Sequence, residues 1–286
     1  MPIPPLQALG HALTHALAHA LVPSTWARAT TALLAATLYA AAASASGPGG
    51  GQPPTVQFNQ CTEFVGLAVV DATAARALVP ARYTLVADAA GARLVVRAAD
   101  CAAVRVGARP ARPGRVAQVG LVIVSPDGTG TDPNTSINNY TLGYVSNAPA
   151  LVQALRGAGV PALLDEGLAY TAPPATPGGG SGELFVAVAP EPSGAGPRWF
   201  LHGTVNVPGF DTSFLANWWV AGPGGRETKM ATTLPLISFD FGSQVSFTTQ
   251  RIGALATLLP GHRIENFVLS FRGAFPAATM VTTVTR

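Results

Sequence analysis

The chain has 286 residues, of which 48% are hydrophobic and only 11% are charged, so it is long and apolar enough to bury a sizeable core. This composition excludes a largely disordered protein and leaves a surface rich in Thr, Ser, Asn, Gln and Gly. Seventeen basic residues against fourteen acidic ones give a formal charge of +3, which is too small to indicate binding to nucleic acid.

The first 45 residues indicate a secretory signal peptide with a long amino-terminal extension. Residues 29–45, ATTALLAATLYAAAASA, are uncharged, follow Arg28 and end in Ala43, Ser44 and Ala45, the small-x-small pattern of a cleavage site. An uncleaved anchor is the alternative, but this Ala-rich segment is short for a membrane span. We therefore expect a secreted, periplasmic or cell-envelope protein that has no transmembrane anchor after cleavage.

Residues 46–54, SGPGGGQPP, predict a flexible linker, and residues 55–286 predict a single domain. For that domain we expect a mainly β (α+β) fold: an antiparallel β-barrel or closed sandwich of about ten strands with three short helices. The strand-like runs are Phe64–Val70, Arg93–Ala98, Val116–Val124, Tyr140–Val145, Leu184–Ala189, Trp199–Val207, Phe214–Val220, Lys229–Phe239, Val245–Thr249 and Ile264–Arg286.

Helix signals lie between these runs. Asp71 is expected to cap a first helix that stops at Pro80, and Asn147 to cap a second that ends near Gly157. A third helix is predicted from about Thr249 to Leu259. Residues 173–182, PPATPGGGSG, fit either a domain boundary or a long hairpin loop, and the loop is preferred because a boundary would leave two incomplete sheets.

Cys61 and Cys101 are the only cysteines, and we expect them to form a disulfide in an oxidising compartment. A catalytic thiol is the alternative, although no histidine lies near either cysteine in sequence. The arginines at positions 105, 109, 112 and 115 are spaced by Pro and Gly, which predicts four positive charges on one exposed loop. Such a loop is either simply solvated or an anion site.

Residues that carry chemistry are sparse in the predicted domain. It has two histidines, His202 and His262, no cluster at metal-ligand spacing, no phosphate-binding loop and no G-x-S-x-G turn. In the leader, histidines at 11, 15 and 19 would share one helix face, but they lack a fourth ligand. We therefore expect neither a metal nor a cofactor. Asn134 and Asn139 match glycosylation acceptors, which matter only in a eukaryotic secretory pathway.

Two segments combine polar and aromatic side chains within strand-like runs. Strict alternation in NNYTLGY places Asn138, Tyr140, Leu142 and Tyr144 on one face, and in FLANWW it separates Asn217 and Trp219 from Trp218. Inside a barrel, such residues suit a small-molecule pocket or an ordinary core equally well. The candidate ligand-binding residues are Tyr140, Arg156, His202, Asn217 and Trp218.

Glu227 and Lys229 stand two apart in RETKMATTLPLISF and therefore share one face of a strand. If that face points outward, they form a weak surface pair. If it points inward, burial would lower the pKa of Lys229, which could then act as a nucleophilic amine or general base beside a carboxylate. Lys229 and Glu227 are the candidate catalytic residues.

The order of elements resembles that of the acetoacetate decarboxylase superfamily, a β-barrel family with few helices. The resemblance begins with FVGLAVVDATAARALVPARYTL, a strand and a short helix that ends in Val-Pro. It continues in NNYTLGYVSNAPALVQALRGAGVPALL, where the family has a Tyr-containing strand, an Asn- and Pro-led helix and a turn. It extends through RETKMATTLPLISF to the final helix and strand, and so covers most of the predicted domain.

The resemblance implies a barrel with a pocket but not the family's reaction. The decarboxylases carry two lysines near the end of the second helix, one that forms a Schiff base and one that lowers its pKa. The matching stretch, Ala154–Val160, holds Arg156 and no lysine, and arginine stays protonated. We expect the protein to bind, or to bind and transform, a small carbonyl or carboxylic compound. The alternatives are a non-catalytic small-molecule carrier or an envelope-associated binding protein.

Overall fold

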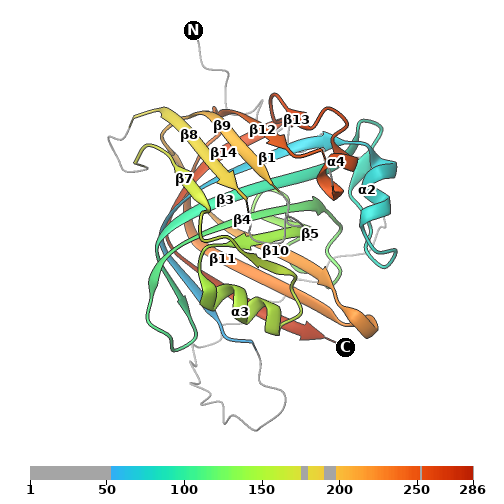
Figure 1. Ribbon diagram of the computed structural model, residues 1–286, viewed down its shortest axis with the longest axis horizontal. Helices are drawn as coiled ribbons and strands as arrows, with labels where there is room; N and C mark the ends of the chain where they lie inside the picture. Colours follow the sequence, from blue (N-terminus) through green and yellow to red (C-terminus); the bar gives the residue numbers. More distant parts are fainter. Residues whose placement is uncertain (1–52, 175–179, 190–197, 252, 286) are drawn as a thin grey trace, which may run out of the picture. The chain divides into compact units, whose positions relative to one another are not determined.

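The structure is a computed structural model that describes residues 53–174, 180–189, 198–251 and 253–285. These residues hold fourteen strands, β1 to β14, and three α-helices, α2 to α4 (Figure 1). The predicted signal peptide and residues 46–52 of the predicted linker lie outside the described ranges.

Seven strands close into a barrel in the order β1, β14, β11, β10, β5, β4, β3 and back to β1. Their bounds are Val56–Val70 (β1), Gly91–Val106 (β3), Arg112–Val122 (β4), Ser136–Ser146 (β5), Phe210–Ala221 (β10), Glu227–Asp240 (β11) and Leu269–Thr285 (β14). The expectation of a purely antiparallel barrel is wrong, because β5 and β10 pair in parallel. After β5 the chain builds α3 and much of a second sheet, and it then returns beside β5 in the same direction.

Five other strands form this second sheet, which is antiparallel throughout and lies over one side of the barrel. They are β7 (Ala169–Thr171), β8 (Gly182–Val188), β9 (Trp199–Val205), β12 (Gln244–Thr249) and β13 (Arg263–Ile264), while β2 (Ala87–Asp88) and β6 (Ala162–Leu164) extend the barrel sheet at β3 and β5. Strands β7 and β8 pair with each other, so the Gly- and Pro-rich segment 173–182 connects two neighbouring antiparallel strands. This agrees with the prediction of a hairpin loop rather than a domain boundary.

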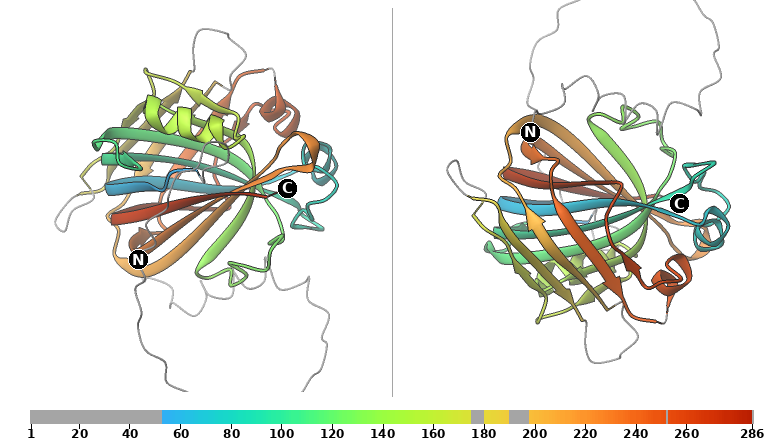
Figure 2. Two further views of the ribbon diagram at one scale, coloured as in Figure 1. Left: turned by 90° about the horizontal axis from the view of Figure 1, so that it is seen from below. Right: turned by 90° about the horizontal axis from the view of Figure 1, so that it is seen from above.

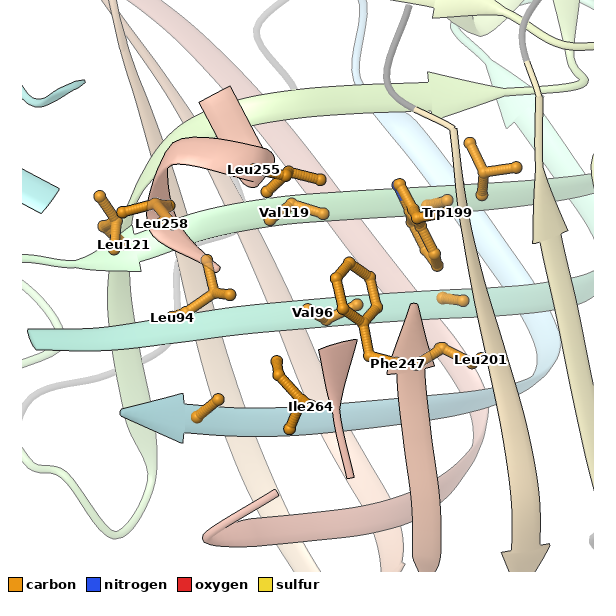
Figure 3. Close-up of a cluster of buried hydrophobic side chains, with 14 of the residues drawn as sticks. Leu94, Val96, Val119, Leu121, Trp199, Leu201, Phe247, Leu255, Leu258 and Ile264 are labelled. Carbon is orange, nitrogen blue, oxygen red and sulfur yellow. The ribbon is translucent and has the colours of Figure 1, made fainter. Parts of the chain in front are cut away.

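Alternation along the barrel strands divides their side chains between two cores. In β3, Val95 belongs to an inward core that takes residues from all seven barrel strands. Its neighbours Leu94 and Val96 point outward into a second core between the barrel and the second sheet (Figure 3). There the rings of Trp199 and Phe247 pack with centroids 5.5 Å apart. Strands β1, β3 and β4 therefore contribute to both cores.

Two short helices cover the edge of the outward core. Helix α2 (Ala72–Leu78) begins after Asp71, whose carboxylate accepts a hydrogen bond from the Ala74 amide at 2.7 Å, which confirms the predicted cap. Helix α4 (Ala254–Leu258) is shorter than predicted and lies beside α2 (Figure 1). None of the described helices is long and apolar enough to cross a membrane.

Helix α3 (Pro149–Gly157) lies across one end of the barrel and buries Leu151 and Leu155 in the inward core (Figure 2). At its far end the Thr228 hydroxyl of β11 donates to the Ala158 carbonyl at 2.6 Å. The predicted cap at Asn147 is wrong. Its side chain instead accepts a hydrogen bond from the Arg115 amide at 2.7 Å and so joins the end of β5 to β4.

The predicted disulfide is present. Cys61 of β1 and Cys101 of β3 lie directly opposite each other in the antiparallel register and are bonded, with both side chains in the inward core. The bond therefore joins two neighbouring barrel strands from inside.

Candidate functional site

Charged and polar side chains meet inside the barrel, around Arg97. Across β3, β4 and β5 the register aligns Arg97, Gln118 and Tyr144, so all three side chains share the inward face. Arg97 donates from Nε to Glu63 Oε2 at 2.6 Å and from Nη1 to Gln118 Oε1 at 2.6 Å. Its Nη2 takes part in neither bond. The guanidinium thus holds a carboxylate and an amide while one nitrogen stays uncommitted.

The carboxylate and the amide that Arg97 holds are both buried. Glu63 is 4% exposed and Gln118 is 3% exposed, so the ion pair must offset a substantial desolvation cost. A side chain at Gly273 on β14 would place its Cβ 2.9 Å from Glu63 Cγ, so this glycine leaves the space that the carboxylate occupies. Burial raises the pKa of Tyr144 against the opposing charge of Arg97, which keeps a neutral hydroxyl beside the guanidinium.

The polar line continues along β5. Thr141 pairs with Gly120 and Asn139 pairs with Val122, so both side chains point inward. Asn139 is fully buried, and neither its Oδ1 nor its Nδ2 has a hydrogen-bond partner; the same is true of Thr141 Oγ1. Buried polar atoms are normally bonded, so these side chains have unused hydrogen-bonding capacity. We call Glu63, Arg97, Gln118, Asn139, Thr141 and Tyr144 the barrel cluster.

An irregularity in β5 explains why alternation misplaced Tyr140. The register between β4 and β5 shifts at Val119 and Gly120, which inserts an extra residue on the β5 side. Tyr144 therefore points inward, whereas Tyr140 points outward and packs against Tyr83 with ring centroids 5.1 Å apart. The expectation that both tyrosines share one face is wrong.

Lys229 and Glu227 lie on the outward face of β11, since their neighbours Thr228 and Met230 are buried toward the barrel interior. Lys229 Nζ lies 2.7 Å from Asp127 Oδ2 and 4.9 Å from the centroid of the Trp219 ring. Because it is the chain's single lysine, no lysine faces the barrel cluster.

Lys229 and Glu227 interact with neighbouring side chains on the outside of the barrel. Partial burial opposes the charge of Asp127, but hydrogen bonds from Lys229 and Thr129 outweigh it and lower its pKa to about 2. Burial, and then the neighbouring Glu227 carboxylate, raise the pKa of Tyr83. Lys229 thereby fixes the segment around Asp127 against the outside of the barrel.

The other predicted ligand-binding residues are scattered. Trp218 is buried inside the barrel opposite Asn139 and so adjoins the barrel cluster. Asn217 points outward and donates to Asn138 at 3.0 Å, Arg156 is exposed and donates to the Ala162 carbonyl at 2.7 Å, and His202 is exposed on the second sheet. The structure therefore brings only Trp218 of this set to the barrel cluster.

Sequence reasoning missed Glu63, Arg97 and Gln118, although each left a signal. All three are single charged or amide residues within apolar strand segments, in TEFVGL, LVVRAA and VAQVGL. Each stands an even number of positions from a residue of the inward core, such as Val65, Val95 or Val116. A polar residue at the position of a buried one is the pattern that would have identified them.

The predicted arginine loop is a hairpin between β3 and β4. Arg105 and Arg112 lie near its strand ends and Arg109 at its tip, but Arg115 lies within β4, where its Nε donates to Asp100 at 2.9 Å. The expectation of four charges on one loop is therefore wrong for Arg115.

Within the described ranges, no three His, Cys, Asp or Glu side chains are grouped so that they could hold a metal. Of the two glycosylation motifs, Asn134 is exposed whereas Asn139 is fully buried, so the folded barrel has no room for a glycan at Asn139.

Comparison with known proteins identifies the fold. No protein-family model and no curated protein matches the sequence. Among solved structures, the chain is similar to the enduracididine biosynthesis enzyme MppR with HEPES buffer bound, at a TM-score of 0.52 and 12% identity over 82% of this chain and 88% of that one. It is also similar to an acetoacetate decarboxylase, at a TM-score of 0.51 and 10% identity over 82% and 89%. The chain has an acetoacetate decarboxylase-like fold.

Proposed function

We propose that the protein binds a small carbonyl or carboxylic compound inside its barrel. The observation that carries this proposal is the barrel cluster, a buried group with uncommitted hydrogen-bonding atoms. Arg97 Nη2, the Tyr144 hydroxyl and Asn139 Nδ2 can all donate, which suits the oxygens of a carbonyl or carboxylate. The similarity in fold to acetoacetate decarboxylase, an enzyme named for a small keto acid, supports this ligand class.

Any chemistry in the barrel must proceed without an imine, because the single lysine lies outside and is paired with Asp127. Glu63 is the one carboxylate of the barrel cluster and so the group available to accept a proton from a bound compound. The same lack of an inward lysine supports the second candidate, a carrier that binds the compound without transforming it.

Binding can be tested by titrating the purified protein with pyruvate, acetoacetate and acetate while following tryptophan fluorescence, since Trp218 adjoins the barrel cluster. Tyr144→Phe removes one inward hydroxyl, and we expect it to weaken binding about tenfold, the effect of one hydrogen bond. Tyr140→Phe is the matched control, because it removes an outward hydroxyl from the same strand and should leave affinity unchanged. If none of the three compounds binds, or if Tyr144→Phe binds as tightly as the wild type, the proposal fails.

Imine chemistry can be tested separately by intact mass after incubation with the same keto acids and borohydride. We expect no covalent adduct, since Lys229 faces outward and is held by Asp127 and Thr129. A reduced adduct that maps to Lys229 would show that the lysine reaches the ligand, and the proposal of a lysine-free mechanism would then be abandoned.

We further propose that the protein is exported, with cleavage after Ala45 and a linker over residues 46–54 ahead of one domain. The leader sequence supports export, and so does the disulfide, which is typical of oxidising compartments. The intact mass of the exported protein should lack the first 45 residues and one hydrogen from each cysteine. Protein that stays in the cytoplasm with its leader attached contradicts this proposal.

A further inference from the structure

A second polar site lies on the other face of the barrel wall, around Arg272 of β14. Arg272 is fully buried and forms no ion pair with any carboxylate of the described residues. It donates from Nη1 to the Asn206 carbonyl at 3.3 Å and from Nη2 to the Pro173 carbonyl, and its Nε has no partner. A guanidinium that is buried without a direct ion pair is costly.

The groups around Arg272 compensate its charge only in part. Tyr170 of β7 interacts with it electrostatically. The Tyr170 hydroxyl is buried beside Thr62, which opposes the rise in its pKa that burial causes, but it forms no hydrogen bond of normal distance and angle. Asp240 pairs with Arg272 in the register of β11 and β14, and its charge favours the guanidinium. It forms no direct ion pair with Arg272, and its Oδ2 accepts from the Gly242 amide. Burial raises the pKa of Tyr170 and lowers that of Arg272, so the tyrosine stays a neutral donor.

This site is separate from the barrel cluster. Arg272 lies between Phe271 and Gly273, which point inward, and it pairs with Phe64 of the outward core. It therefore faces the second sheet, and the segment from Tyr170 to Pro173 passes over it. A ligand held here would contact both the barrel and the second sheet.

We propose that Arg272 and Tyr170 bind one small monovalent anion, chloride or a simple carboxylate, between β14 and β7. The Arg272 Nε–H and the Tyr170 O–H are both unpartnered donors, and an anion between them would satisfy both while neutralising the guanidinium. A single positive group beside the Asp240 carboxylate favours a charge of minus one over a multivalent anion such as phosphate. The bound anion would stabilise the docking of the second sheet on the barrel.

Thermal unfolding at constant ionic strength tests this proposal, with sodium chloride replacing sodium gluconate, whose anion is much bulkier than chloride. We expect the melting temperature to rise saturably, by about 3–6 °C at ten times the dissociation constant. Line broadening in chloride NMR should show the binding directly, and competition by acetate should reverse the broadening if a carboxylate is the better ligand.

Three variants identify the residues responsible. Arg272→Met should abolish the chloride dependence. Tyr170→Phe removes only a hydroxyl and should weaken chloride binding about tenfold. This variant still tests the proposal if Arg272→Met does not fold. Arg263→Met is the control, since Arg263 is an exposed arginine in a surface pair, and it should respond to chloride as the wild type does. No saturable response in the wild type, or an unchanged response in Tyr170→Phe, overturns the proposal whatever the barrel cluster binds.

Discussion

Lys229 and Asp127 form an ion pair whose contribution depends on pH. The pKa of Asp127 in the folded protein is about 2, below its ordinary value of 3.8, so the pair stabilises the fold above about pH 4 and this stability is lost as the pH falls toward 2. Asp127→Asn should lower the free energy of unfolding at pH 7 by about 0.5–1 kcal/mol. In urea titrations at pH 2, where about half of Asp127 is protonated, the difference between the variant and the wild type should be much smaller than at pH 7. A difference as large as that at pH 7 would contradict the assignment.

Asn139 should cost stability in the unliganded protein, because two of its buried polar atoms have no partner. Replacing it with Leu, which has the same number of side-chain heavy atoms, should raise the free energy of unfolding by about 1–2 kcal/mol and weaken ligand binding. Asn138→Leu is the control on the opposite face: its oxygen accepts from Asn217 and Trp219, so the same substitution should destabilise the protein. Chemical denaturation of both variants checks this pair, and destabilisation by Asn139→Leu would count against it.

At the scale of single elements, alternation and propensity predicted ten strand-like segments, and each overlaps a strand of the structure. They did not predict the short strands β2, β6 and β7, nor always the face that each residue takes. The Asp71 cap could be predicted because it depends on residues three apart. The inward turn of Tyr144 could not, because the shift at Gly120 depends on a neighbouring strand. There a side chain would meet the Tyr140 carbonyl at 2.6 Å and the Trp218 ring at 2.8 Å, contacts that appear only after the strands have paired.

Gly273 is the position in β14 where one methyl group should disturb the barrel cluster. Its Cβ would lie 2.9 Å from Glu63 Cγ and 3.0 Å from Ile237 Cδ1, so Gly273→Ala must displace the Glu63 side chain or the strands around it. We expect a loss of about 1–3 kcal/mol in the free energy of unfolding, together with weaker ligand binding. Gly157→Ala at the end of α3 meets nothing within 4 Å and should be neutral or stabilising by up to about 1 kcal/mol. Equal stability of the two variants in urea would show that the space beside Glu63 is not needed.

For the whole molecule, the sequence indicates a β-rich domain, and its resemblance to the decarboxylases indicates the fold, but the closure of the barrel depends on distant pairings. β1 pairs with β14 across almost the entire domain, and the parallel pairing of β5 with β10 follows a long excursion through the second sheet. The barrel cluster likewise depends on the pairing of separate strands. Glu63, Arg97 and Gln118 come from three strands, and only their register shows that they meet.

The disulfide stabilises the closed barrel by joining two of its strands covalently. Cys61 and Cys101 are 40 residues apart and join β1 to β3, two strands that belong to both cores. Chain entropy for a loop of this length predicts a contribution of about 4 kcal/mol, so reduction should lower the melting temperature by roughly 8–16 °C for a domain of this size. The double variant Cys61→Ala, Cys101→Ala should melt near the reduced wild type in calorimetry and show no further response to reductant. Because both cores share β1 and β3, far-UV dichroism and tryptophan fluorescence should report one transition at the lower temperature. Separate transitions would mean that the second sheet unfolds independently of the barrel.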